Sequence, residues 1–251
     1  MLGRKKAATF SQTRYSLRGN KVEMIAAIHQ PQFLPWLGYF DKMKKADAFC
    51  YLDNVQYKKN EWQNRNQIKS SNGRTWITVP VQYRFPQKIY EVKVNNRTDW
   101  KKKHLLTIAS CYGKSNFFKE YISFFQEMYN LNWDRLVDLN IYGSEQLRQI
   151  FGISLEKVVV ASKLELSDHP TDRLIDICHV LGCDTYLSGS GGRNYLELER
   201  FQARGVKVVF QDFEPPLYTQ RFGEYLSHLS VIDWLFNCGT DGNFTTGGIR
   251  K

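Results

Sequence analysis

The stretch MIAAIHQPQFLPWLGYFDKMKKADAFCYLDNV, residues 24–55, holds the clearest fold signal in this chain. Its opening, MIAAIHQ, is apolar without alternation and ends at a polar pair before Pro31, which indicates a short buried strand. LGYFDKMKKA then predicts a short amphipathic helix, and DAFCYLDNV predicts a second strand. Residues 24–55 therefore predict a β-α-β unit, the building block of a parallel sheet.

The C-terminal half shows the same alternation. The strand-like runs VVVAS (158–162), DTYLS (184–188) and VKVVF (206–210) are separated by the helical patterns PTDRLIDICHVLG and YLELERFQARG. Strands that alternate with helices form a parallel sheet that is covered on both faces. Together with the opening unit, these segments predict an α/β fold with a five-stranded, mostly parallel sheet and helices on both of its faces.

Two segments of different character lie between these halves. Residues 56–103 are rich in Asn, Gln, Lys and Trp and contain the β-like runs TWITVPV (75–81) and IYEVKV (89–94), so we expect a β-rich insertion. Residues 104–151 have helical patterns and predict a helical cap. The domain organisation that we expect is a disordered basic arm at 1–23, a single α/β domain at 24–239 whose second β-α-β-α-β half occupies 152–239, and a flexible tail at 240–251.

The composition is that of a packed protein. Of the 251 residues, 42% are hydrophobic and 24% are charged, which disfavours extensive disorder. No run approaches the roughly 20 consecutive apolar residues of a membrane span, and the basic N-terminal segment lacks the apolar core of a signal peptide. The five cysteines lack the paired short spacing of zinc or redox sites, so we expect a cytoplasmic protein with reduced thiols and no metal.

The chain is strongly basic. Its 35 Lys and Arg residues against 25 Asp and Glu give a formal charge of +10. Such an excess favours polyanionic partners, whether nucleic acid, phosphorylated or nucleotide-linked metabolites, or an anionic membrane face. Signatures of RNA-recognition and helix-turn-helix modules are missing, so a nucleic-acid-binding role, such as tRNA binding, depends on charge alone. It remains an alternative to an enzyme.

The polar pair His29 and Gln30 ends the first predicted strand. Open parallel sheets bind ligands in the crevice beyond the carboxyl ends of their strands. Trp36 and Tyr39 lie at the start of the following helix, whose N-terminus would face a bound phosphate or carboxylate. We expect His29 and Gln30 to be catalytic and to line the largest pocket, with Trp36 and Tyr39 binding substrate. A structural hydrogen-bonding role is the alternative for His29.

A dense cluster of polar and aromatic residues follows the second predicted strand. Amide and guanidinium groups suit sugar hydroxyls and phosphates, and the face of a Trp ring suits a sugar ring or a base. A solvated loop is the alternative. The expected binding residues are Gln56, Lys58, Trp62, Asn64, Arg65, Asn66 and Lys69, with Asp53 as a further catalytic candidate.

A glycine-rich segment, SGSGGRNYL, follows the strand predicted at 184–188. Backbone amides of such a turn could hold a phosphate. The spacing is neither that of a Walker loop nor that of a dinucleotide fingerprint, so a plain tight turn is the alternative. The expected phosphate-binding residues are Ser188, Gly189, Gly191, Gly192 and Arg193.

A second histidine, His104, begins a predicted helix after three lysines. A neutral His29 or His104 could be the base that takes a proton from an amine nucleophile during acyl transfer. Lys103 could hold an anionic donor, with a charged surface face as the alternative. No cysteine lies on a strand-to-helix elbow, which disfavours a thiol nucleophile.

The chain resembles the WbqC-like family through IHQPQFLPWLGYFDKMKKADAFCYLDNVQYKKNEWQNRNQIK, and the likeness continues through WITVPV, WKKKH, LSGSGGRNYL and LSVIDWLFNCG. This resemblance spans about residues 24–239 and implies a role in O-antigen or other surface-polysaccharide biosynthesis. The implied reaction transfers an acyl or aminoacyl group to the amine of a nucleotide-linked or lipid-linked amino sugar. The donor would be a coenzyme A thioester, a carrier-protein thioester or an aminoacyl-tRNA, so a carrier protein or a tRNA would be a partner.

A weaker likeness is to nucleotidyltransferase-type folds. WLGY, at residues 36–39, has the glycine of their His-x-Gly-His loop but neither histidine. The enzymatic alternatives are therefore an ATP-dependent adenylate-forming ligase or a nucleotidyltransferase-like enzyme, with ATP as the cosubstrate.

Overall fold

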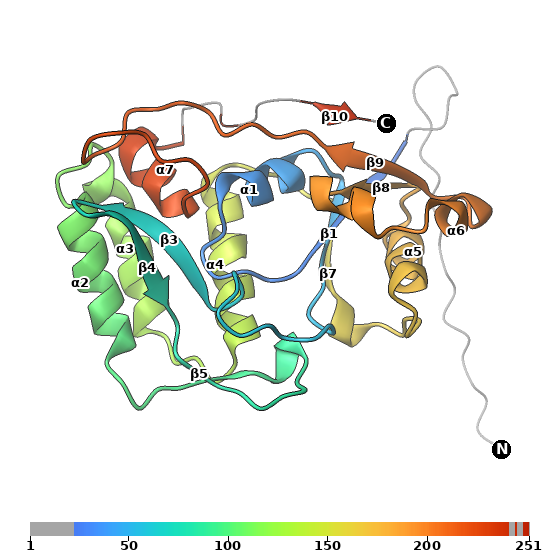
Figure 1. Ribbon diagram of the computed structural model, residues 1–251, viewed down its shortest axis with the longest axis horizontal. Coiled ribbons are helices and arrows are strands. Elements are labelled where there is room, and N and C mark those ends of the chain that lie inside the picture. Colours follow the sequence, from blue (N-terminus) through green and yellow to red (C-terminus); the bar gives the residue numbers. More distant parts are fainter. Residues whose placement is uncertain (1–22, 241–243, 245–247, 251) are drawn as a thin grey trace.

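The computed structural model describes residues 23–240, 244 and 248–250. Its central sheet has the strand order β10-β9-β8-β1-β2-β7, in which β10 pairs antiparallel with β9 and all other pairs are parallel (Figure 1). The predicted α/β fold with a five-stranded parallel sheet is therefore confirmed, and β10 adds a short antiparallel edge. The strands are β1 (Ile25–His29), β2 (Ala48–Tyr51), β7 (Lys157–Val160), β8 (Thr185–Ser188), β9 (Lys207–Gln211) and β10 (Ile249–Arg250).

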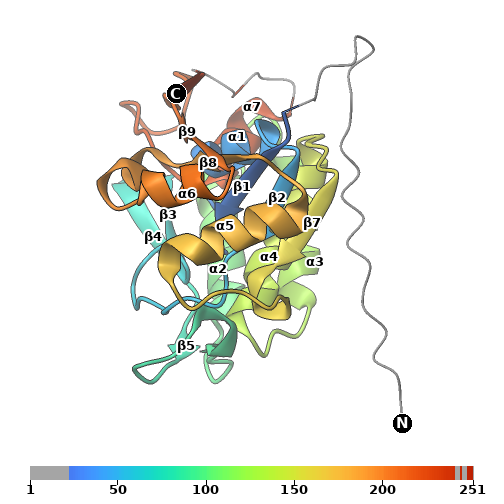
Figure 2. The same cartoon turned by 90° about the vertical axis from the view of Figure 1, so that its right-hand side faces the viewer.

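Helices cover both faces of this sheet. Helix α1 (Leu37–Lys44) packs on one face, and α5 (Pro170–Leu181) and α6 (Leu198–Ala203) pack on the other, as the side view shows (Figure 2). Because side chains alternate along a strand, Ala27 joins the core shared with α1 whereas Ala26 joins the core shared with α5. Burial on both faces explains why the sequence of β1 is continuously apolar.

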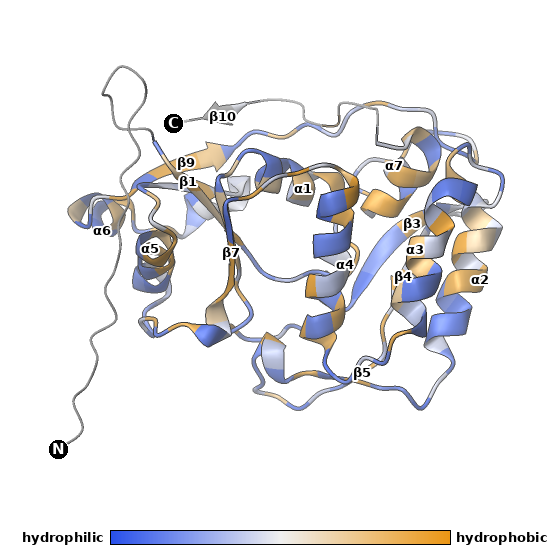
Figure 3. Cartoon of the chain, turned by 180° about the vertical axis from the view of Figure 1, so that it is seen from behind, coloured by the Kyte–Doolittle hydropathy of each residue, from blue (hydrophilic) through white to orange (hydrophobic). Residues whose placement is uncertain are grey.

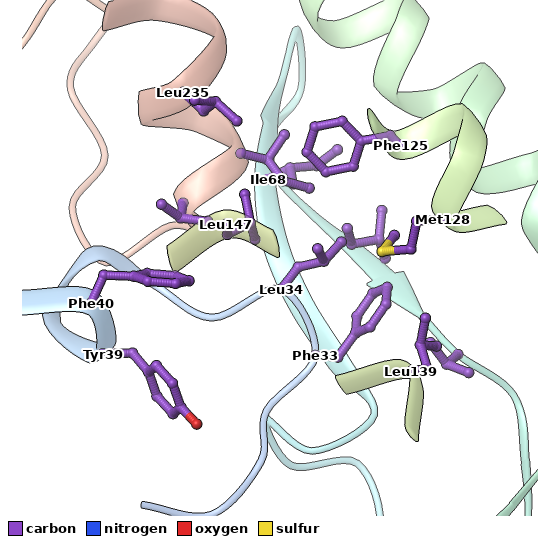
Figure 4. Close-up of a cluster of buried hydrophobic side chains, with 14 of the residues drawn as sticks. Phe33, Leu34, Tyr39, Phe40, Ile68, Phe125, Met128, Leu139, Leu147 and Leu235 are labelled. Carbon is purple, nitrogen blue, oxygen red and sulfur yellow. The ribbon is translucent and has the colours of Figure 1, made fainter. Parts of the chain in front are cut away.

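A helical layer with a β-hairpin packs beyond α1. Its elements are the strands β3 (Arg65–Ser70), β4 (Gly73–Thr78), β5 (Val81–Gln82) and β6 (Lys93–Val94), and the helices α2 (Trp100–Tyr112), α3 (Phe118–Asn130), α4 (Leu136–Ile150) and α7 (Val231–Cys238). Figure 4 shows their shared core, in which Leu34 from the loop after β1 meets Ile68 of β3 and Phe125 of α3. One hydrophobic core therefore joins the sheet, the hairpin and the helices.

The helices of this layer differ in how much surface they bury. Helix α7 buries every residue from 231 to 236, and Figure 3 shows it as mostly hydrophobic, whereas α2 and α4 carry hydrophilic stretches. A helix that is apolar nearly all round belongs inside a protein. The start of α7 is tied to the loop after β1, because Ser230 Oγ donates to the carbonyl of Leu34 at 2.7 Å.

The insertion contains less strand than its sequence predicts. Residues 89–91 form a 3₁₀ turn instead of a strand, since their amides donate to the loop after β2: Ile89 to the carbonyl of Val55 and Tyr90 to that of Asp53. The predicted basic arm, residues 1–23, lies outside the described residues except for Glu23. Of the predicted tail, residues 240–251, the structure describes 240, 244 and 248–250. Within the described part of the chain, no helix is both long and apolar enough to cross a membrane.

Candidate functional site

A cavity of about 520 Å³ opens at the carboxyl ends of β1, β2 and β8. The polar and aromatic side chains in its wall belong to His29, Gln30, Lys42, Lys58, Arg173, Tyr186, Ser188 and Tyr195, and the glycine turn after β8 completes it. We expected His29 to line the largest pocket. His29 does line this cavity, but the cavity is not the largest, because a groove between α2 and α3 measures about 610 Å³.

The order of the strands places this cavity. From β1 the chain builds outward through β2 and β7 on one side and later through β8 and β9 on the other. The neighbours β1 and β8 are thus the topological switch point, where open α/β sheets bind ligands. β1 pairs with β2 as far as His29, but its pairing with β8 ends at Ala27 and Leu187. The two strands therefore part at their carboxyl ends, and the pocket opens there.

His29 lies in the pocket wall at the end of β1. Its Nδ1 lies 3.1 Å from the carbonyl oxygen of Gln30, and its ring centroid lies 4.6 Å from that of Tyr39. Burial, together with the nearby ammonium of Lys42, lowers the pKa of His29 to about 3. The imidazole is therefore neutral near pH 7, where it can accept a hydrogen bond but is a weak proton acceptor.

The amide of Gln30 is held by its neighbours. Gln63 Nε2 donates to Gln30 Oε1 at 2.7 Å, and Gln63 Oε1 in turn accepts from the backbone amide of Lys58 at 2.9 Å. Tyr39 contributes by donating its hydroxyl to the carbonyl of Gln30 at 3.3 Å. Since the oxygen end of the Gln30 amide is engaged, its NH₂ end is the one that can donate to a ligand.

Lys42 is a site residue that sequence reasoning missed. It is 2% exposed, yet it lines the pocket from α1, and its Nζ donates to the carbonyl of Ile28 at 2.8 Å. Burial lowers its pKa to about 7. The available signal was its place in the helix, because Lys42 falls on the apolar stripe of Tyr39 and Met43, where a lysine is unusual.

The rest of the wall is suited to an anion. Arg173, in the first turn of α5, uses its guanidinium to bond the carbonyls of Ser167 and Asp168, at 3.2 and 3.0 Å, and has further N–H groups for a ligand. A Cβ on Gly192 would overlap the side chain of Ser188, so the glycine allows a close turn there. No Asp or Glu of the described residues lines the cavity. Cations without carboxylates favour a phosphate or another anionic group.

Neither His104 nor Lys103 is brought to this pocket. His104 is buried in the helical layer, where its Nδ1 lies 3.1 Å from the hydroxyl of Tyr129 and its Nε2 lies 3.1 Å from the carbonyl of Thr78. Both ring nitrogens are therefore engaged in holding α2 to α3 and to the hairpin. Lys103 lies on the exposed side of α2. We leave both residues out of the proposed site.

Four polar residues that we expected in the site make structural contacts outside the cavity instead. Asp53 accepts the amide and the hydroxyl of Ser162, at 2.8 and 2.6 Å. Gln56 Nε2 donates to the carbonyls of Tyr57 and Gln87. Asn64 donates to the carbonyl of Val79, and Asn66 donates to the carbonyls of Phe33 and Leu34. All four side chains bond backbone groups of the loops, which is a structural task.

Lys69 is also buried away from the pocket. Its Nζ donates to Gln220 Oε1 and to the carbonyls of Gly223 and Glu224. These contacts tie β3 to the segment before α7. The charge of Lys69 is therefore not presented to the cavity.

The remaining expected binding residues lie outside the cavity in aromatic contacts. Trp62 and Trp76, both 41% exposed, have ring centroids 5.6 Å apart, and the guanidinium of Arg65 lies 4.0 Å over the ring of Trp76. Trp36 stacks with His228, and the guanidinium of Arg193 lies 4.1 Å over the ring of Phe210. The structure thus brings together His29, Gln30, Lys58, Ser188, Gly189, Gly191 and Gly192, with Tyr39 behind them.

A metal centre has no support in the described part of the chain, where no group of three or more His, Cys, Asp or Glu side chains could hold an ion. Burial also raises the pKa of all five cysteine thiols, which disfavours a thiolate nucleophile. Burial raises the pKa of the Cys238 thiol to about 11, and it raises that of Cys183 to about 12.

Comparison with known proteins places this chain in a family. The sequence pattern of the WbqC-like protein family matches residues 30–243. The chain is also 34% identical over 221 residues to the uncharacterized protein Rv1507c of Mycobacterium tuberculosis (strain ATCC 25618 / H37Rv), and the alignment covers 86% of this chain and 94% of that relative. No solved structure matches the chain.

Proposed function

The chain belongs to the WbqC-like protein family, and we propose that it is an enzyme of surface-polysaccharide biosynthesis that transfers an acyl or aminoacyl group to the amine of a nucleotide-linked or lipid-linked amino sugar. The observation that supports this most is the switch-point pocket, whose wall contains the basic residues Lys42, Lys58 and Arg173. Both kinds of acceptor carry phosphates, and a basic pocket without carboxylates suits them.

The dimensions of the pocket agree with such a substrate. Small-molecule sites commonly measure about 300–1,000 Å³, and this cavity of about 520 Å³ falls within that range. Lys58, Arg173 and the amides of the glycine turn would hold the phosphates. Tyr195, at the rim, is 67% exposed and offers a ring face to a sugar or a base.

Acyl transfer needs an uncharged amine and a stabilised carbonyl oxygen. The NH₂ end of Gln30 would donate to the oxygen on which negative charge develops. The neutral ring of His29 can accept a hydrogen bond from the acceptor amine and so orient it. Both roles are consistent with the hydrogen bonds that hold these side chains at the end of β1.

A ligand screen tests this proposal. A compound that binds only the folded state stabilises it, by about 2.7 kcal/mol at a concentration 100 times its Kd. We expect UDP-glucosamine to raise the melting temperature more than UDP, ATP, coenzyme A or tRNA. Lys58→Ala should weaken the affinity for UDP-glucosamine by about tenfold, the value of one charged hydrogen bond. Lys59→Ala is the matched control, because Lys59 is a neighbouring exposed lysine outside the cavity wall.

The same screen distinguishes the alternatives. A shift produced by ATP and not by nucleotide sugars would favour an adenylate-forming ligase or a nucleotidyltransferase-like enzyme. Binding of tRNA with a steep salt dependence, without a small-molecule shift, would favour a nucleic-acid-binding protein. A wild-type protein that responds to no nucleotide or lipid-linked sugar would contradict the proposal.

A further inference from the structure

We propose that Lys42 is the general base of the switch-point pocket, and that its amine takes the proton that the sugar ammonium must release before it can attack the acyl carbon. This inference deepens the proposed function and rests on it. Its geometric support is the position of Lys42, which reaches from α1 to the end of β1, where its Nζ lies 2.8 Å from the carbonyl oxygen of Ile28.

Lys42 occupies the position where β1 and β8 separate. The pairing of β1 with β8 ends at Ala27, one residue before Ile28, and the Lys42 amine donates to the carbonyl of Ile28 at this end of the strand. The same amine lies 5.7 Å from the ring centroid of Tyr186 on β8. Lys42 therefore lies between the two strands, beneath the mouth of the pocket.

The charge of Lys42 is not balanced by a carboxylate among the described residues. The other titratable groups in the pocket wall are His29 on β1, Lys58 after β2, Arg173 on α5, Tyr186 on β8 and Tyr195 after the glycine turn, and none of them is a carboxyl group. Asp41, its neighbour on α1, is engaged elsewhere, because it accepts from Lys45 at 2.8 Å and from Gln211 at 2.6 Å. A buried ammonium in basic and apolar surroundings is unfavourable, so the neutral amine is favoured.

The neutral form has the groups that a base needs. Burial lowers the pKa of Lys42 to about 7, so a large fraction of the amine is uncharged near neutral pH. A neutral amine that donates one N–H to Ile28 still has its lone pair for an incoming proton. His29, with a pKa of about 3, binds a proton too weakly to compete, and a base works best when its pKa is near the operating pH.

The step balances in atoms and electrons. The sugar ammonium gives one proton to the lone pair of Lys42 Nζ and becomes a neutral amine. The lone pair of that amine forms the new N–C bond to the carbonyl carbon of an acyl thioester or ester, and the C–S or C–O bond breaks with its electron pair going to the leaving group. The leaving group takes the second proton from the nitrogen. The products are the amide and a free thiol or alcohol, after which Lys42 returns its proton to solvent.

Turnover measurements on the full-length chain test this role. With UDP-glucosamine and acetyl-coenzyme A as probes, Lys42→Met and Lys42→Arg should each reduce the rate of amide formation by about 10²–10⁴-fold, the usual contribution of a general base. The thermal shift produced by UDP-glucosamine should persist in Lys42→Met. Lys44→Met is the matched control, since Lys44 is an exposed lysine on the same helix, and it should keep wild-type turnover.

A chemical arm of the experiment needs no substrate. Acetic anhydride modifies only neutral amines. The pH dependence of Lys42 acetylation, followed by mass spectrometry, therefore measures the pKa of Lys42. We expect a midpoint near pH 7, whereas free Nα-acetyllysine in the same tube should follow the ordinary value of about 10.4. A midpoint like that of the free amino acid, or full turnover in Lys42→Met, would overturn the assignment. If the wild type forms no amide, the proposed function is contradicted. The acetylation midpoint then tests Lys42 by itself: a midpoint near pH 7 supports a neutral amine, and a midpoint like that of the free amino acid contradicts it.

Discussion

Acidification should destabilise this protein through His104. Both ring nitrogens of His104 are engaged inside the helical layer, and burial lowers its pKa from 6.5 to about 4. Between these two values the unfolded chain binds a proton at this residue that the folded chain does not bind. The free energy of unfolding must therefore fall as the pH is lowered from about 6.5 to about 4. Above pH 6.5 the contribution of His104 to stability is fully present.

The size of the effect follows from the two pKa values. With 6.5 in the unfolded state and about 4 in the folded state, His104 removes about 2 kcal/mol between pH 7.5 and pH 5.0. His29 acts in the same direction. The buried carboxyl groups of Asp41, Asp53 and Asp233 act in the opposite direction, because burial raises their pKa values and the folded chain then binds protons first. The total pH profile therefore does not isolate His104.

A difference between variants does isolate it. Urea unfolding of the wild type and of His104→Gln, each at pH 7.5 and 5.0, should show a loss on acidification that is about 2 kcal/mol smaller in the variant. Contributions from the other groups cancel in this comparison. The control Ile108→Val, at a buried position one turn further along α2, should lower stability by about 1 kcal/mol at both pH values and keep the wild-type difference. An unchanged difference in His104→Gln would refute the reasoning.

Two further substitutions test the packing. Phe125→Ala removes a fully buried ring from the core shown in Figure 4. In urea titration it should lower the free energy of unfolding by about 3–5 kcal/mol. A loss below about 1 kcal/mol would contradict the assigned core. Gly182→Ala places a Cβ at the end of α5, where φ is +74°, and should lower the free energy of unfolding by about 1–2 kcal/mol. Gly189→Ala is the control, because φ is −68° there and the space around the glycine is open, so the free energy of unfolding should fall much less.

The sheet could be predicted from the sequence because its strands are short and buried on both faces. Residues 25–28 and 48–51 are apolar throughout, and the alternation with helices fixes the parallel direction of these strands. The order of the strands is not written in any local pattern. The placement of β8 beside β1 depends on contacts between residues 160 positions apart, such as that between Met24 and Asp184.

The site could be predicted only where chemistry coincides with a strand end. His29, Gln30 and the glycine turn meet in one cavity because the carboxyl ends of parallel strands share an edge of the sheet. Lys42 was missed because its helix was interpreted as a simple amphipathic one, in which lysines face solvent. Asn66 and Lys69 were misplaced for the opposite reason, since a polar side chain that satisfies buried backbone carbonyls looks the same in sequence as one that binds a ligand.

The separation of β1 from β8 along the chain also has a consequence for synthesis on the ribosome. β1 is translated early, but it remains without its neighbour on one side until β8 follows about 160 residues later. At roughly 5–20 residues per second, this interval lasts roughly 10–30 s. During that time the nascent chain exposes an unpaired apolar strand edge, which can pair with other chains. Binding of chaperones to the emerging chain should therefore matter most in this interval. Ligand binding by the switch-point pocket should appear only when the last third of the chain has emerged.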